Sequence, residues 1–208
     1  MFEIETIIMF TTASLLLALA PGPDNIFVLT QSIVHGRKAG IIITLGLCTG
    51  LIFHTAIVVL GIAAIFQTSL TAFNTLKFIG AAYLLYLAYQ AFISKEKVEQ
   101  NQETPELKSA HLYRTGIIMN VTNPKVSIFF LAFLPQFTKV NNGAMPVQII
   151  LLGAIFILCT FFVFSIISQI SGAIGKVLYK SDKLSGVLNK VAGTVFAALA
   201  VKLIFTQR

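Results

Sequence analysis

The chain has 208 residues, of which 56% are hydrophobic and 11% are charged, and its formal net charge is +7. Soluble domains have about 25% charged residues, so this chain has too few polar side chains to cover a soluble fold of its size. Its basic residues lie between apolar blocks and are not paired with an aromatic platform on one helix face, which argues against nucleic-acid binding.

Six apolar blocks follow one another, each near or above the ~18–20 residues that a helix needs to cross about 30 Å of hydrocarbon. The sequence lacks the alternating ten-residue segments of a membrane β-barrel. A transmembrane helix satisfies its backbone polar groups within the segment, so we predict helices. They are expected at residues 4–34 with a break at Pro21-Gly22-Pro23, 39–65, 70–93, 115–137 with a break near Pro124, 145–172 and 184–205.

The first block ends in Ala18-Leu19-Ala20, which resembles a signal-peptidase site. A signal peptide begins with a positively charged region, whereas this segment has Glu3 and Glu5 and no Lys or Arg. Pro21 directly after the candidate cleavage point is also unfavourable. We therefore expect the first block to be a retained transmembrane helix.

The strongly polar stretch at residues 94–114 divides the chain into two halves, residues 1–93 and 115–208. A shift of 103 residues aligns Pro21 with Pro124, Gly40 with Gly143 and Gly50 with Gly153, which indicates an internal repeat. A half with three spans ends on the opposite side of the membrane from its start, so the second half must have an inverted orientation relative to the first. We predict an all-α membrane domain of two inverted three-helix repeats, an arrangement in which transporters bind substrate near the midplane.

Basic residues gather on one set of predicted loops, which contains Arg37 and Lys38, the linker at 94–114, and Lys176, Lys180 and Lys183. The opposite side has little beyond Lys139 and Arg208. Cytoplasmic loops carry the excess of Lys and Arg, so the linker is expected in the cytoplasm and both termini outside.

Two places interrupt the apolar pattern deep in the predicted membrane, each at a proline that removes a helix hydrogen bond. Gly22-Pro23-Asp24 and Asn123-Pro124-Lys125 both have the pattern of an N-cap, a proline at the first helical position and a charged residue after it. Each break is therefore expected to start a half-helix whose positive N-terminal end points into the protein, as in an anion site.

Asp24 and Lys125 are expected far from either membrane surface. Lys125 lies 11 residues after Arg114, about 16 Å along a helix. A charge at that depth is costly unless it is paired or faces a polar cavity. One interpretation is that Asp24 receives the ammonium of an amino acid or a coupling proton, and that Lys125 and the helix N-termini hold the carboxylate. The other is that the two charges form an ion pair that locks the halves together.

The predicted substrate-binding residues are Pro21, Gly22, Pro23, Asp24, Asn25, Asn120, Asn123, Pro124 and Lys125. Asp24 and His54 are the candidates for proton coupling, although a lone histidine is more often a packing or hydrogen-bonding residue. Gly46 and Gly50 have the spacing of a helix-contact pair. Cys48 and Cys159 lie inside apolar blocks and fit small core residues, and the spacing of Cys and His predicts no metal site or cofactor.

These segments resemble the LysE/RhtB family of amino-acid exporters. The resemblance rests on Ala20-Pro21-Gly22-Pro23-Asp24, on residues 35–40, on Lys77 followed by Gly80-Ala81-Ala82-Tyr83-Leu84, and on Asn123-Pro124-Lys125 with Phe133-Leu134-Pro135-Gln136-Phe137. It covers nearly the whole chain in the same order. It implies export of amino acids or close derivatives across a bacterial inner membrane, driven by a proton or substrate gradient, and it leaves the substrate open.

Three other function classes are weaker. An ion or metal exporter is the main alternative, but the apolar blocks contain almost no Cys, Asp or Glu to act as ligands. A membrane enzyme would need a nucleophile with a base or a metal motif. A non-transporting scaffold would leave the charges inside the membrane unexplained. The expected partners are a small amino-acid substrate and the lipid bilayer, and a homodimer is plausible for a chain this small.

Overall fold

The computed structural model describes residues 2–62, 70–93, 108–139, 142–178 and 182–205. In the first half, helix α1 (Ile4–Leu19) is followed by α2 (Pro23–His35), with a bend of 57° between them. Pro21 and Pro23 lack amide hydrogens, so two helix hydrogen bonds cannot form at this point. The predicted break in the first span is therefore present.

Two further helices complete the first half. Helix α3 (Arg37–Ile57) starts after Gly36, which has a φ of 83° that favours glycine, and it continues into a π-helical segment η1 (Val58–Ile62). Helix α5 (Leu70–Ile93) has the bounds expected from its apolar block.

The second half also starts with a broken helix. Helix α6 (Ser109–Thr122) bends by 52° into α7 (Pro124–Ile128), which continues as π-helical η2 (Phe129–Phe133) and 3-10 helical η3 (Leu134–Phe137). The chain then forms α8 (Met145–Leu178) and α9 (Asp182–Phe205). Gly143 before α8 has a φ of 105°, so the structure matches it to Gly36 and not to Gly40, which lies inside α3.

The all-helical membrane fold is confirmed for the described residues. Three helices are long and apolar enough to span a membrane on their own, and the two bent pairs bring the number to five when each pair is one span. Helix α6 already begins at Ser109, so residues 109–114 of the predicted linker are helical, and the cytoplasmic location of the linker stays a prediction. Residues 94–107 lie outside the described part of the chain. The count of six spans stays a prediction.

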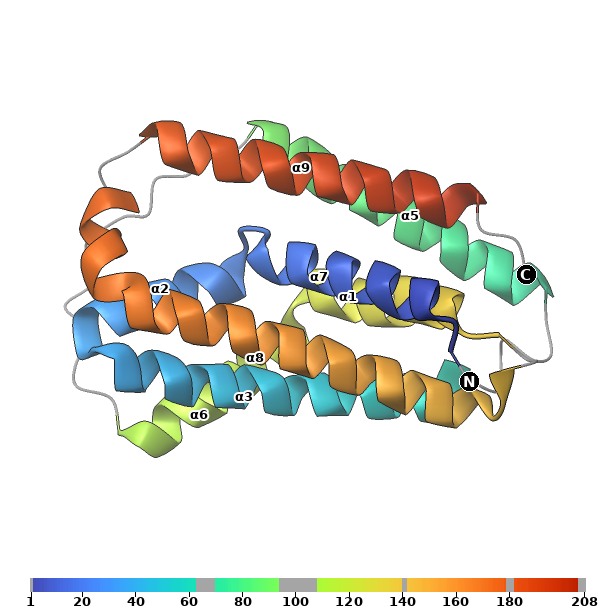
Figure 1. Ribbon diagram of the computed structural model, residues 1–208, viewed down its shortest axis with the longest axis horizontal. Helices are drawn as coiled ribbons and strands as arrows, with labels where there is room; N and C mark the ends of the chain where they lie inside the picture. Colours follow the sequence, from blue (N-terminus) through green and yellow to red (C-terminus); the bar gives the residue numbers. More distant parts are fainter. Residues whose placement is uncertain (1, 63–69, 94–107, 140–141, 179–181, 206–208) are drawn as a thin grey trace.

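The helices form an elongated bundle in which α5 and α9 run side by side along one flank (Figure 1). Helix α3 packs against α6 and α8, and α8 also packs against α1 and α2. The α3–α6 and α1–α8 pairs, with α3–α8 and α5–α9, are those expected if a twofold axis relates α1–α2 to α6–α7, α3 to α8 and α5 to α9. The α2–α8 pair has no comparable α3–α7 counterpart among the described residues. The inverted repeat itself stays a prediction.

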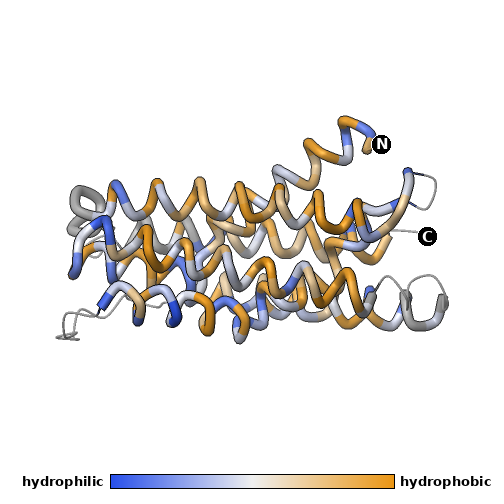
Figure 2. The backbone as a smooth tube through the Cα atoms, turned by 90° about the horizontal axis from the view of Figure 1, so that it is seen from below, coloured by the Kyte–Doolittle hydropathy of each residue, from blue (hydrophilic) through white to orange (hydrophobic). Residues whose placement is uncertain are grey.

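Hydrophobic residues dominate the length of the bundle, and most hydrophilic residues lie toward its two ends (Figure 2). The start of α1 and the end of α9 lie at the same end, opposite the turn at Gly36 (Figure 1). The larger buried core contains a group of phenylalanines from α1, η2, η3, α8 and α9: Phe10, Phe129, Phe130, Phe133, Phe137, Phe156 and Phe196. A second, smaller core surrounds Val28, Ile43, Leu47 and Phe164.

Candidate functional site

The first break carries two buried polar residues at the start of α2. Gly22 is the N-cap, Pro23 takes the first helical position, and Asp24 follows with only 3% of its surface exposed. Asn25 is also buried, and its Nδ2 donates a 2.6 Å hydrogen bond to the carbonyl oxygen of Ala18. This side chain therefore satisfies one of the carbonyls that the broken helix leaves without a backbone donor.

The second break has the predicted N-cap arrangement in full. The Asn123 side-chain oxygen accepts a 3.0 Å hydrogen bond from the Lys125 backbone amide, and Pro124 takes the first helical position. Lys125 is 7% exposed, and its Nζ donates a 3.1 Å hydrogen bond to the carbonyl oxygen of Ala20. A side chain of the second half thus reaches the helix end that the first half leaves open.

Asn120 connects the first break to α3. Its Nδ2 donates a 3.4 Å hydrogen bond to Asp24 Oδ2, and its backbone carbonyl accepts a 3.1 Å hydrogen bond from His54 Nε2. Asn120 and His54 are both buried. The structure therefore aligns Asp24, Asn120 and His54 in one chain of polar contacts between α2, α6 and α3.

The close approach of α3 to α6 depends on glycines. A Cβ at Gly116 would lie 2.5 Å from the Ile43 carbonyl oxygen, and one at Gly46 would lie 2.2 Å from the Tyr113 carbonyl oxygen. One turn further along α3, a Cβ at Gly50 would lie 2.7 Å from the Asn120 side chain. The small residues predicted to make helix contacts do so here, and they let Asn120 reach Asp24.

Opposite charges share this cluster without forming a direct ion pair. The Asp24 carboxylate interacts electrostatically with Lys125 and with His54, while the Lys125 ammonium is hydrogen-bonded to Ala20. Four buried polar atoms around them have no hydrogen-bond partner: Asp24 Oδ1, Asn25 Oδ1, Asn120 Oδ1 and Asn123 Nδ2. The Asn123 side chain interacts with the Asp24 carboxylate without reaching hydrogen-bond distance of Oδ1. Buried polar atoms are nearly always bonded, so a cluster with this many unbonded atoms fits a small polar ligand.

The structure thus brings six of the predicted substrate-binding residues together: Gly22, Asp24, Asn25, Asn120, Asn123 and Lys125. The prolines have a different position. Pro23 and Pro124 are exposed and Pro21 is half-buried, so their contribution is to open the helix backbone. His54 lies at the edge of the cluster, against Asn120 and the Phe130 ring.

Sequence comparison adds an independent observation. Residues 15–207 match the family model described as "LysE type translocator". The chain belongs to this family. It is therefore a membrane translocator and not an enzyme, as the sequence predicted.

The LysE-type translocator has relatives that it matches over nearly their whole length. It is 32% identical over 187 residues to the homoserine/homoserine lactone efflux protein of Salmonella typhimurium, covering 90% of each chain. It is 28% identical to an uncharacterized membrane protein, YrhP, of Bacillus subtilis, covering 95% of this chain and 98% of the relative. No solved structure matches the translocator.

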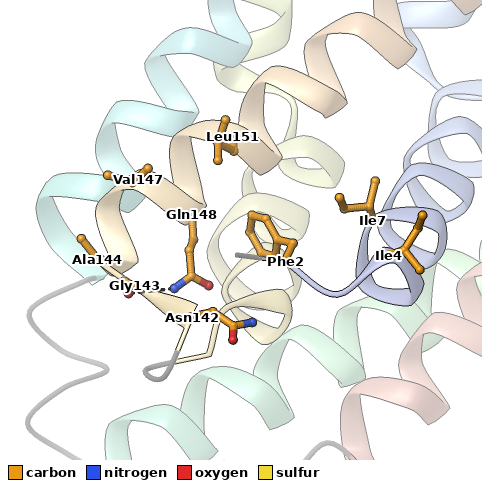
Figure 3. A pocket seen from close by; sticks show the side chains of 9 residues that line it. All are labelled: Phe2, Ile4, Ile7, Asn142, Gly143, Ala144, Val147, Gln148 and Leu151. Atoms are coloured by element: carbon orange, nitrogen blue, oxygen red, sulfur yellow. Dashed lines mark hydrogen bonds between the residues drawn. The ribbon is translucent and has the colours of Figure 1, made fainter.

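A pocket of about 540 Å³ lies elsewhere in the translocator, between the start of α1 and the start of α8 (Figure 3). Its lining is mostly apolar and includes Phe2, Ile7 and Leu151. Beside it, Gln148 bonds the Lys139 backbone and the Gly143 carbonyl, and Lys139 pairs with Glu3 at 2.9 Å. None of the lining residues belongs to the polar cluster.

Sequence reasoning missed the Ala18 and Ala20 carbonyls. A backbone oxygen has no residue-type signature, so the only available signal was the break itself, which leaves carbonyls of the preceding turn without donors. Among the described residues, no group of three or more His, Cys, Asp and Glu side chains is arranged to hold a metal ion.

Proposed function

We propose that this translocator exports amino acids or close derivatives from the cytoplasm, with the substrate bound between the two helix breaks. The observation that carries the proposal is the burial of Asp24 and Lys125 in one polar cluster, linked through Asn120 and the Ala20 carbonyl. The Salmonella relative named as a homoserine/homoserine lactone efflux protein supports this substrate class.

The cluster offers both signs of charge to a small zwitterion. The open Oδ1 of Asp24 accepts a hydrogen bond from the substrate ammonium. The Lys125 ammonium has donors beyond the one it gives to Ala20, and these serve the substrate carboxylate or carbonyl. Homoserine and its lactone differ at the carboxyl group and share the primary amine, so the amine contact is the one common to both.

We further propose that export is coupled to protons through Asp24 and His54. Asn120 joins the two residues, because its side chain contacts Asp24 and its carbonyl contacts His54. Histidine changes its charge near neutral pH, and a carboxylate that exchanges a proton for a substrate ammonium keeps its local charge balanced. The gradient that drives export is then the proton gradient across a bacterial inner membrane.

Both termini are proposed to lie outside the cell. The start of α3, which contains Arg37 and Lys38, lies at the end of the bundle opposite the start of α1 and the end of α9 (Figure 1). Reporter enzymes fused within residues 94–107 are expected to report a cytoplasmic location. A periplasmic signal from those fusions would reverse the orientation.

The transport test uses proteoliposomes that contain the purified full-length chain and are preloaded with labelled homoserine or a panel of other amino acids. The wild type is expected to exchange at least one of them, and Asp24→Asn and Lys125→Met are expected to lose exchange. Glu5→Gln and Lys190→Met are matched controls, because both remove an exposed charge of the same type. Normal exchange by both site variants, or no exchange of any amino acid by the wild type, would contradict the proposal.

A further inference from the structure

The Ala20 carbonyl is an acceptor that the fold leaves open for a cation. In a continuous helix it would accept the backbone amide of Asp24. The extended backbone of Gly22, with φ of −179° and ψ of 176°, prevents that hydrogen bond. The oxygen lies at the C-terminal end of α1, which is the negative end of the helix dipole. It is instead bonded to the Lys125 ammonium at 3.1 Å.

Gly22 provides the space for that ammonium. Any residue can adopt the extended conformation of Gly22, so the backbone does not require glycine at this position. The space does require it, because a Cβ there would lie 2.9 Å from Lys125 Nζ and 3.5 Å from Lys125 Cε. The absence of a side chain at Gly22 therefore leaves the room that the Lys125 ammonium occupies.

Asp24 supplies a second acceptor for a cation at the same break. Its carboxylate interacts electrostatically with the Lys125 ammonium without forming an ion pair with it, and its Oδ1 has no hydrogen-bond partner. A carbonyl oxygen and an open carboxylate oxygen together suit a primary ammonium, which has several N–H donors.

We propose that Ala20 and Asp24 form the subsite for the substrate's primary ammonium, and that Lys125 occupies the Ala20 side of this subsite when the translocator is empty. The inference rests on the proposed function and assigns the empty-state occupant of that same site. The substrate amine displaces the Lys125 ammonium from the Ala20 carbonyl. Lys125 then turns to the substrate's carboxylate or carbonyl oxygen. Lys125 is thus an internal competitor that keeps the buried carbonyl satisfied between transport cycles.

Binding of an amine without a carboxyl group tests this assignment. We would measure n-butylamine binding to the detergent-purified full-length chain by calorimetry, in the wild type, in Lys125→Met and in Lys125→Met combined with Gly22→Ala. Lys125→Met vacates the subsite, so the affinity is expected to rise about tenfold. In the double variant the Cβ of residue 22 fills the vacated space, so the gain is expected to disappear. Lys190→Met is the control and should bind like the wild type.

The double variant separates competition from simple removal of a positive charge, because Gly22→Ala changes no charge. Butyltrimethylammonium adds a second control, since it carries the charge but has no N–H group to bond Ala20, and it should gain little. Lys125→Ala repeats the test if Lys125→Met gives poor yield. Any of three results would overturn the inference. The first is no rise in n-butylamine affinity in a folded Lys125 variant, and the second is a rise that persists with Gly22→Ala. The third is an equal rise in affinity for butyltrimethylammonium. The binding measurements do not depend on transport. Failure of this inference can therefore be told apart from failure of the proposed function, which would show as a wild type that exchanges no amino acid.

Discussion

The two helix breaks share a sequence pattern but differ in how their exposed backbone groups are satisfied. At Asn123-Pro124-Lys125 the N-cap side chain bonds the amide of its own helix. At Gly22-Pro23-Asp24 the N-cap has no side chain, and the open carbonyls before it are reached by Asn25 and by Lys125 from the other half. The second break is capped by its own N-cap side chain, whereas the first break is satisfied by a side chain of its own helix and by one from the other half.

The helices after the breaks differ in the same way. Helix α2 is regular and presents a buried polar stripe of Asp24, Asn25, Gln31 and Ser32. The chain after Pro124 turns into π and 3-10 segments packed among phenylalanines. Two breaks with the same sequence pattern can therefore differ in structure. The first is followed by a helix whose buried polar side chains can contact a substrate, and the second by segments held in place among phenylalanines. A zwitterionic substrate needs such a difference, because its two ends carry opposite charges.

The largest expected effect comes from exchanging the charges of the two breaks. In Asp24→Lys combined with Lys125→Asp, a carboxylate would face the Ala20 carbonyl, and two acceptors cannot bond each other. We expect exchange in proteoliposomes to fall about 100-fold or more, as for loss of a buried charge contact worth several kcal/mol. Recovery of exchange in the double variant, relative to each single variant, would instead indicate a simple ion pair between the halves.

The next effect concerns the glycine contact that positions the second break. Gly116→Ala places a methyl group against the Ile43 carbonyl oxygen, so we expect a loss of about 1–3 kcal/mol of stability from overpacking. Thermal unfolding in detergent measures it. Gly186→Ala is the matched control, since a Cβ there meets nothing within 4 Å. Equal midpoints for the two variants would mean that α3 and α6 do not need this close approach.

A smaller pair of effects separates the roles of the two N-caps. Asn123→Ala removes a capping hydrogen bond and should cost about 1 kcal/mol of stability, with a partial loss of exchange because its side chain belongs to the polar cluster. Gly22→Ser should leave the unfolding midpoint nearly unchanged, because the far end of Lys125 can move aside, but it should lose exchange. If both variants lowered stability and exchange in the same proportion, the two breaks would have equivalent roles.

The smallest effect on exchange is expected for His54→Gln, which keeps a donor near the Asn120 carbonyl. Equilibrium exchange of substrate should change less than about threefold, corresponding to a fraction of a kcal/mol. Accumulation driven by a proton gradient should fall much further, because glutamine cannot carry a proton. Unchanged accumulation would remove His54 from the coupling proposal.

Much of the fold could be predicted from the sequence because lipid forces apolar blocks into helices. The bounds of α5 and the N-cap, proline and charged-residue pattern at both breaks were predicted residue by residue. The start of α6 at Ser109 was not, because a helix can continue into a polar stretch beyond the hydrocarbon. The irregular segment after Pro124 was not either, because it depends on Pro135 and on how phenylalanines of α1, α8 and α9 pack around it.

The candidate site was predicted in its residues but not in its contacts. The sequence indicated that Asp24 and Lys125 are deep in the membrane, and the structure buries both. It gave no means of knowing that Lys125 bonds the Ala20 carbonyl or that Asn120 bonds Asp24, because such pairings depend on how the second half packs against the first. The glycines at that crossing were predicted to make helix contacts, but their partners are set only in three dimensions.

The most direct test of a substrate site at the breaks is protection of Asp24 from a membrane-permeable carbodiimide, measured by mass spectrometry on the native sequence. Asp24 should be modified in the empty translocator, and a transported amino acid should suppress that modification at concentrations near its transport KM. The exposed Glu3 and Glu5 should react equally with and without substrate. Modification of Asp24 that is indifferent to every transported amino acid would contradict a substrate site between the two breaks.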